Sequence, residues 1–274
     1  MSENKIILEK EIRFSQSIMW GDQKKYYDEK GIGAWEDDVP FYITSNPFIA
    51  HSYANVAIRF IQDWVNKNPD AKKHAFTFLE LGAGTGQFSF YFLKNLMSLR
   101  SDLKLDEIKI RYIMSDLTTN SFEFWGSHHA LKPFVDAGIL EFLAFDLYHP
   151  KKEDIKTVNP LIIIANYLFD SVGTDVFCVK DGQLHESLVI LKTDESNLID
   201  GKPRDWEKVE IEYIDKPIHE KYYGGLYDDV LFSYEKKLTS THFQFPIASL
   251  QAIDRKSTRL NSSHSDRSRM PSSA

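Results

Sequence analysis

FLELGAGTG, residues 78–86, decides the fold of this chain. An apolar run carries the carboxylate of Glu80 near its end, and glycine then takes every second position, at Gly82, Gly84 and Gly86. The run predicts a buried parallel strand, and the glycines predict a turn from that strand into a helix. Glycine lacks the Cβ atom that would collide with a ligand, and a helix beginning near Gln87 offers free backbone amides to a polar or anionic group. The stretch therefore predicts a turn that binds a nucleotide-type ligand.

Details of the turn separate the kinds of nucleotide loop. A dinucleotide fingerprint has glycine or alanine three positions after Gly84, where this chain has Gln87. A Walker loop needs a Gly-Lys-Ser or Gly-Lys-Thr triplet, which the sequence lacks. Glu80 followed by the three glycines resembles motif I of class I S-adenosylmethionine-dependent methyltransferases, and this resemblance implies S-adenosylmethionine as the cofactor. The alternative is a glycine-rich turn in another kind of α/β protein.

Strand and helix patterns alternate after this turn. Strands are expected at residues 75–81, 108–114, 140–144 and 161–165, with helices at residues 87–99 and in the stretch that ends at 137. This order predicts a Rossmann-like α/β fold with a parallel sheet and right-handed crossovers. Beyond Asp170 the pattern changes, and two segments joined by Asp181-Gly182 predict a β-hairpin. A strand near residues 209–213 and helices at 226–238 and up to 253 are also expected.

Residues 1–70 are expected to form a helical N-terminal extension. Asn46 suits a helix N-cap and Pro47 the first helical position. One helical face is predicted to pack in the core, formed by Ile49, Tyr53, Val56, Ala57, Phe60 and Trp64. Residues 71–253 are expected to form a methyltransferase-like domain.

The last residues, 254–274, are expected to be an artefactual tail. DRKSTRLNSSH, Asp254 to His264, and SRMPSSA, Ser268 to Ala274, resemble the translation of a sequencing-library adapter. A natural Ser/Arg-rich disordered tail is the alternative. Class I methyltransferase sheets have seven strands, and only four strands of the parallel core are expected before the tail. We therefore expect a fragment whose methyltransferase-like domain is truncated at its C-terminus.

Composition restricts the partners. The net charge of -7 repels polyphosphate and argues against general nucleic-acid binding. The one cysteine, Cys178, excludes a disulfide framework and a cysteine metal cluster, and is typical of a reducing compartment. No long uncharged apolar run and no secretory signal pattern occur, so we expect a cytoplasmic protein without a membrane partner. The oligomeric state is left open.

Four polar residues are expected at the carboxyl ends of the predicted parallel strands: Glu80, Asp116, Asp146 and Asn166. In open α/β sheets a ligand binds beyond these ends, where the strand order reverses. The class I resemblance implies that Asp116 accepts hydrogen bonds from the ribose hydroxyls. It also implies that Asp146 meets the adenine amino group with Leu147 against the ring, and that Glu80 orients the glycine loop near the methionine ammonium. The alternatives are a helix N-cap at Asp116 and a loop aspartate at Asp146.

NYLFDS, Asn166 to Ser171, resembles the NEFFDA-type segment of the MidA-like family. These are methyltransferases associated with mitochondrial complex I assembly, and they include a protein arginine methyltransferase. YITSNPFIAHSYA, residues 42–54, also resembles a segment of that family, and the resemblance extends from Phe41 to Glu186. Tyr167 stands where the family has glutamate, which argues against arginine as the substrate.

The same segment is predicted to border the acceptor, a protein side chain or small molecule. Asp170 is expected to accept a proton or hold a substrate cation, and Tyr167 to line the methyl channel beside Asn166. A loop cap and a packing aromatic are the alternatives for Asp170 and Tyr167. Because the sulfonium methyl is already electrophilic, such an enzyme mainly positions its reactants.

Other chemistries lack their motifs. His128 and His129 are adjacent without HxxxH or HExxH spacing, no GxSxG occurs, and the NPPY prolines of nucleic-acid amino methyltransferases are missing. We expect no metal. The sequence thus predicts S-adenosylmethionine-dependent methyl transfer. The alternatives are a non-catalytic assembly or scaffold protein of the same fold, and a nicotinamide-dependent oxidoreductase, which Gln87 opposes.

Overall fold

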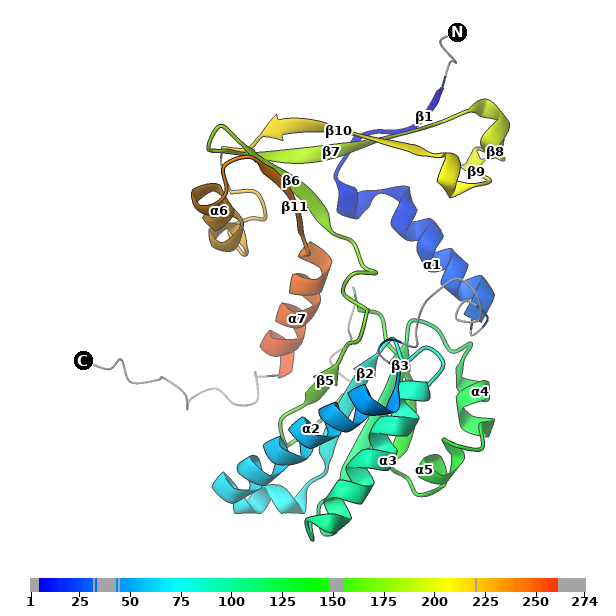
Figure 1. Cartoon of the computed structure of the whole chain (residues 1–274), viewed down its shortest axis with the longest axis vertical. Helices are drawn as coiled ribbons and strands as arrows, with labels where there is room; N and C mark the ends of the chain where they lie inside the picture. Colours follow the sequence, from blue (N-terminus) through cyan, green and yellow to red (C-terminus); the bar gives the residue numbers. More distant parts are fainter. Residues whose placement is uncertain are drawn as a thin grey trace, which may run out of the picture. The chain divides into compact units, whose positions relative to one another are not determined.

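The computed structural model describes residues 5–31, 33, 43, 45–147, 155–219 and 221–260. The chain forms two compact units (Figure 1). Met1–Lys24 with Ser171–Gln251 is called the antiparallel unit, and Lys25–Asp170 with Ala252–Ala274 the parallel unit. Helices α1 (Ile18–Lys30) and α7 (Ile247–Leu260) each continue from one unit into the other.

The parallel unit contains a four-stranded parallel sheet with the order β4-β3-β2-β5. Its strands are β2 (Phe76–Leu81), β3 (Ile110–Asp116), β4 (Leu140–Ala144) and β5 (Ile162–Ile164). The chain runs outward from β2 to β4 and then returns to place β5 on the other side of β2. The predicted Rossmann-like fold is confirmed, and the strand order reverses between β2 and β5.

Strand β2 is mostly apolar, as a strand covered on both faces requires, and all six of its residues are buried, the polar Thr77 and Glu80 included. Helices α2 (Pro47–Lys67) and α3 (Gln87–Asp102) pack against each other (Figure 1). Phe78 of β2 packs its ring edge-on against Phe92 of α3, with centroids 5.3 Å apart. The short helices α4 (Phe122–Ser127) and α5 (Lys132–Asp136) fill the predicted helical stretch before β4.

Helix α2 begins as predicted but buries a different face. The Asn46 side chain accepts a hydrogen bond from the Ile49 amide at 3.0 Å, and Pro47 is the first helical residue. The predicted face is wrong in part, because Val56 is 72% exposed and Tyr53 40% exposed. The buried residues are Ala50, Ala54, Ala57, Ile58, Ile61 and Val65. Three alanines on this face let the helix approach its neighbours closely, so the aromatic residues lie at its margins.

The antiparallel unit has a sheet with the order β1-β7-β6-β11, and β10 pairs with β7 as well. Its strands are β1 (Ile6–Ile12), β6 (Asp175–Lys180), β7 (Gln183–Thr193), β10 (Glu210–Pro217) and β11 (Thr241–Phe245). Strands β8 (Leu198–Ile199) and β9 (Lys202–Pro203) form a small ribbon, and helix α6 (Asp228–Lys237) follows β10. The predicted hairpin is confirmed: Asp181 and Gly182 have φ angles of 49° and 72°, as a type I′ turn requires.

The helical prediction for the N-terminus is wrong at its start. Residues Ile6–Ile12 form β1, which pairs with β7, and the register shifts along it where Glu11 takes a φ of 55°. These irregularities and the glutamates hide the alternation of a strand. The predicted boundaries 1–70 and 71–253 also differ from the two compact units, since β1 and α2 belong to different units. Of the predicted tail, residues 261–274 lie outside the described part, and α7 includes residues 254–260.

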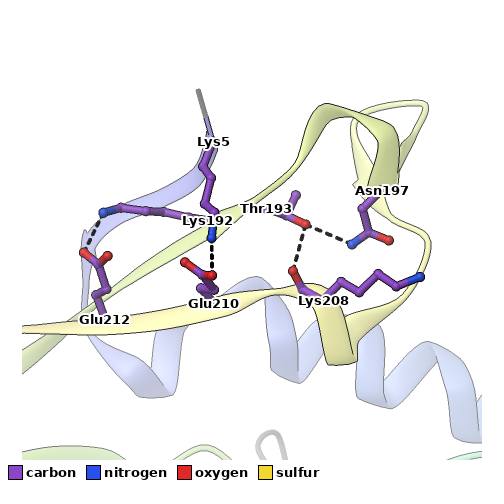
Figure 2. A network of polar contacts seen from close by, with 7 residues as sticks. All are labelled: Lys5, Lys192, Thr193, Asn197, Lys208, Glu210 and Glu212. Carbon is purple, nitrogen blue, oxygen red and sulfur yellow. Dashed lines mark hydrogen bonds and ion pairs between the residues drawn. The ribbon is translucent and has the colours of Figure 1, made fainter. Parts of the chain in front are cut away.

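Polar contacts link the strands on either side of β7 (Figure 2). Lys5, just before β1, forms an ion pair with Glu210 of β10. Lys192 of β7 reaches Glu212 of β10 at 2.5 Å, and the Asn197 amide donates to the Thr193 hydroxyl at 2.9 Å. The two ion pairs are partly exposed and contribute little individually, whereas the Asn197–Thr193 hydrogen bond is buried. Across the described ranges, no helix has the length and apolar character needed to cross a bilayer.

Candidate functional site

The glycine turn after β2 has left-handed backbone at each glycine. The φ angles are 65° at Gly82, 54° at Gly84 and 76° at Gly86, which serves as the N-cap of α3. Residues with a Cβ atom rarely adopt these angles, so the backbone alone explains the glycines. The turn joins β2 to α3 as the sequence predicts.

Protein side chains, rather than open space, surround two of the glycines. A Cβ atom on Gly86 would lie 2.8 Å from Met114 Cε and 3.1 Å from Leu131 Cδ1. One on Gly82 would lie 3.2 Å from Leu168 Cδ1. Close ligand approach is therefore not needed to explain glycine at these two positions, which corrects part of the sequence argument. The Trp125 indole donates to the Gly84 carbonyl at 2.9 Å and holds the turn from the protein side.

Glu80 is buried in β2, just before the glycine turn, and its hydrogen bonds reach the neighbouring elements. Its carboxylate accepts hydrogen bonds from the Tyr112 hydroxyl, at 2.7 Å, and from the Ser89 hydroxyl. Burial raises the pKa of Glu80 to about 7, although these two hydrogen bonds oppose the shift. Ser89 and Tyr112 were missed by sequence reasoning because nothing in their local sequence marks them as partners of a carboxylate.

Asp116 lies at the carboxyl end of β3, beside the glycine turn. Burial raises its pKa, while hydrogen bonds from the Leu117 and Gly84 amides lower it. The Leu117 amide lies 2.8 Å from Oδ1. The negative charge of Asp28 also raises this pKa, and the Asn120 amide donates to the Asp28 carbonyl at 2.9 Å. The helix N-cap alternative does not hold, because the next described helix begins at Phe122 with Ser121 as its N-cap.

Asp146 and Leu147 follow β4 at the same edge of the sheet. Leu147 is buried and Asp146 is partly exposed. The Phe145 amide donates to the Asp116 carbonyl at 2.7 Å, which joins the ends of β3 and β4. The structure thus places the residues predicted to hold the adenine one strand away from the residue predicted to hold the ribose.

Asn166 follows β5, across the switch point from Asp116. The Tyr53 hydroxyl of α2 donates to Asn166 Oδ1 at 3.0 Å. The Nδ2 atom of Asn166 is buried and has no hydrogen-bond partner among the described residues. An unsatisfied buried amide is costly, so this donor is suited to a polar group that arrives from outside. Tyr53 was predicted as core packing and instead positions this amide.

Tyr167 and Asp170 are more open than Asn166. Tyr167 is 56% exposed and has a φ of 49°, a strained angle for an aromatic residue. Asp170 is exposed, and its charge acts on Tyr27 of α1, whose pKa is raised first by burial and then by this carboxylate. The catalytic roles of Tyr167 and Asp170 stay predictions.

The fold and this edge of the sheet define the class of protein. A parallel sheet that reverses its order beside a glycine turn, with acidic residues after successive strands, is the arrangement of a class I methyltransferase domain. Residues 55–262 match the model of a family described as "Putative S-adenosyl-L-methionine-dependent methyltransferase". The match covers more than half of the chain, and the chain belongs to this family. S-adenosylmethionine is accordingly its cofactor.

Two solved structures from Burkholderia thailandensis are also similar to this chain. One is an uncharacterised protein with 14% identity and a TM-score of 0.45, in an alignment covering 88% of this chain and 53% of that one. The other, bound to S-adenosyl-homocysteine, has 17% identity and a TM-score of 0.36, covering 64% of this chain and 36% of that one. The chain thus spans about half or less of their length. No curated protein matches it.

Proposed function

We propose that this chain transfers the methyl group of S-adenosylmethionine to a protein side chain or a small molecule. The observation that carries the proposal is the set of polar side chains at the switch point, where Asp116 lies on one side of the glycine turn and Asn166 on the other. The family match to residues 55–262 supports the same chemistry. The cytoplasmic location and the MidA-like relationship belong to this proposal too.

Asp116, Asp146 and Leu147 are proposed to hold the nucleoside. A carboxylate that accepts from both ribose hydroxyls makes charge-assisted hydrogen bonds, each worth about 1.5–3 kcal/mol. Asp116 must be ionised for this role; burial raises its pKa, and the hydrogen bonds from the Leu117 and Gly84 amides oppose that rise. Leu147 is buried and offers an apolar surface to a base. The carboxylates also suit the positive sulfonium and ammonium groups of the cofactor.

Glu80 is proposed to act through the turn rather than on the acceptor. Its hydrogen bonds to Tyr112 and Ser89 connect β2 with β3 and α3. Fixing these three elements fixes the glycine turn between them. Glu80 is thereby a positioning residue for the cofactor, with Gly82, Gly84 and Gly86 shaping the backbone around it.

Asn166 is proposed to orient the acceptor. The cofactor supplies a methyl group that is already electrophilic, so the protein must mainly place a nucleophile in line with it and keep water away. Tyr53 fixes the amide of Asn166, which leaves Nδ2 to donate to an oxygen of the bound molecule. Asp170 is exposed and follows Asn166 by four residues. It is proposed to take a proton or to hold a cationic acceptor, and Tyr167 is proposed to line the methyl channel.

Calorimetric titration with S-adenosylmethionine and S-adenosylhomocysteine tests the cofactor site. The expected result is saturable binding of one molecule per chain. Incubation with radiolabelled cofactor and either lysate proteins or small metabolites then tests transfer. Binding without incorporation in either fraction would favour the scaffold alternative, whereas absence of binding would overturn the proposed site itself. Binding of the reduced nicotinamide dinucleotide would instead revive the oxidoreductase alternative.

A further inference from the structure

Three potential metal ligands meet in the antiparallel unit. They are Cys178 of β6, Asp215 of β10 and His242 of β11, and their ligand atoms all lie within 4.8 Å of one another. They come from three strands that are far apart in sequence. A sulfur, a nitrogen and an oxygen ligand are thus gathered outside the site described above.

The register of the sheet explains why these side chains share one face. His242 is the direct cross-strand partner of Cys178, and direct partners in an antiparallel pair point to the same side. Asp215 is the direct partner of Ser187, which lies two residues after His185, the partner of Cys178 on β7. The apolar core of this unit lies on the other face, where Phe177 and Val179 are buried. The three ligands are therefore fixed by strand pairing.

Asp215 already forms an ion pair with a cation at this position. Lys180 Nζ lies 2.5 Å from Asp215 Oδ2, and His242 Nε2 lies 3.8 Å from the same oxygen. The Ser187 hydroxyl donates to the other oxygen, Oδ1, at 2.5 Å. This arrangement orients the carboxylate with Oδ2 toward Lys180 and His242. The Lys180 side chain is 48% exposed, so its ammonium can move into solvent without leaving a buried charge.

We propose that Cys178, Asp215 and His242 form a Zn²⁺ site, in which the ammonium of Lys180 takes the place of the metal when the ion is absent. Thiolate, imidazole and carboxylate are the three kinds of side chain that bind Zn²⁺, and a water molecule completes four-coordination. On binding, the Cys178 thiol releases its proton to solvent, the sulfur bonds to the metal, and Lys180 leaves Asp215. The hydroxyl of Ser187 keeps the carboxylate oriented, as partners of metal ligands commonly do.

Such a site would join strands across the sheet. Cys178 lies on β6 and His242 on β11, which pairs with β6. Asp215 lies on β10, which pairs with β7. The metal would bind the folded sheet and not the unfolded chain, so its affinity would add to stability. We expect the midpoint of thermal unfolding to rise when Zn²⁺ is added to the chelator-treated protein.

Cobalt substitution of the full chain tests the proposal. Chelator-treated protein titrated with Co²⁺ should show a thiolate-to-cobalt charge-transfer band that saturates at one ion per chain. Competition of Zn²⁺ with a chromogenic chelator gives the affinity, which should fall at least about tenfold in Cys178→Ser and in His242→Ala. Lys180→Met should instead bind Zn²⁺ more tightly, because the competing ammonium is gone.

His219→Ala is the matched control, since His219 is an exposed histidine of the same unit that is hydrogen-bonded to Gln183. It should bind as the wild type does. Absence of the charge-transfer band, or equal affinity in wild type, Cys178→Ser and His242→Ala, overturns the proposal. Loss of binding in His219→Ala with retention in His242→Ala would do so as well. Circular dichroism checks the fold of each variant, and the gain in Lys180→Met provides a result that misfolding cannot imitate.

Discussion

The pKa values of two carboxyl groups, one in each sheet of this chain, are shifted in opposite directions. In the parallel unit, neutral hydroxyls of Ser89 and Tyr112 surround Glu80, and burial raises its pKa to about 7. In the antiparallel unit, burial also acts on Asp215, but hydrogen bonds from Lys180, Ser187 and Cys178 lower its pKa to about 2. A carboxylate with a nearby cation belongs to a completed ion pair. Glu80 is bonded to hydroxyls instead, so burial outweighs its hydrogen bonds and favours the neutral carboxyl.

The largest expected effect is the pH dependence of stability. The pKa of Glu80 is raised from 4.5 to about 7 in the folded protein. The stability that its protonated carboxyl contributes is therefore fully present below pH 4.5 and is lost as the pH rises through 7. A shift of this size corresponds to about 3 kcal/mol in the free energy of unfolding. Urea unfolding of wild type and Glu80→Gln at several pH values should show this decline only in the wild type. An identical decline in both proteins would show that Glu80 is not its source.

Asp215 is expected to give the opposite pH dependence of stability. Its lowered pKa contributes stability above pH 3.8, which is lost as the pH falls toward 2. Asp215→Asn should therefore lose less stability than the wild type over that acidic range and should leave the decline between pH 4.5 and 7 unchanged.

The next effect concerns cofactor affinity. Asp116→Asn removes the charge of the proposed ribose acceptor, and we expect S-adenosylhomocysteine to bind at least about tenfold more weakly in calorimetry. Asp102→Asn, at the exposed end of α3, is the matched control and should bind normally. Unchanged affinity in Asp116→Asn would remove this residue from the proposed site.

A smaller effect is expected on the acceptor side. Tyr53→Phe removes the hydroxyl that donates to Asn166, at a cost of about 1 kcal/mol. Once an acceptor is known, methyl transfer should slow several-fold while cofactor affinity stays constant, because only the amide loses its orientation. A loss of cofactor affinity equal to the loss in rate would assign Tyr53 a general structural role.

The smallest effect concerns the exposed contacts in Figure 2. Lys192→Ala removes the ion pair with Glu212 and should change the free energy of unfolding by about 0.2–1 kcal/mol, measured in urea. The effect should shrink at high salt, since the Glu212 side chain is 51% exposed. A larger, salt-independent loss would mean that this pair stabilises the sheet more than a partly exposed ion pair is expected to.

Sequence reasoning succeeded where the signal was local. The apolar run of β2 and the Asp181-Gly182 turn each specify their structure within a few residues, and the parallel sheet followed from the alternation of strands and helices. It failed for β1, whose register shifts disrupt the alternation, and for β11, which was not predicted. For α2 the predicted core face was wrong in part, because a neighbouring face rich in alanine is the one that packs in the core.

Side-chain partnerships were the second limit. Strand ends could be read for Asp116 and Asn166, but the contacts of Glu80 with Tyr112 and of Asn166 with Tyr53 depend on tertiary packing. The prediction that the chain has no metal rested on short spacings between ligands, and it stays a prediction. Cys178, Asp215 and His242 show no such spacing, and only strand pairing brings them together.

The indole of Trp125 has a further consequence for the speed of ligand capture. The hydrogen bond from the indole to the Gly84 carbonyl, together with Met114 and Leu131 beside Gly86, fixes the glycine turn before a ligand binds. A ligand then binds a preorganised glycine turn, and little conformational entropy is lost on association. Uptake should accordingly follow a single fast phase proportional to ligand concentration, without a slow rearrangement of the glycine turn.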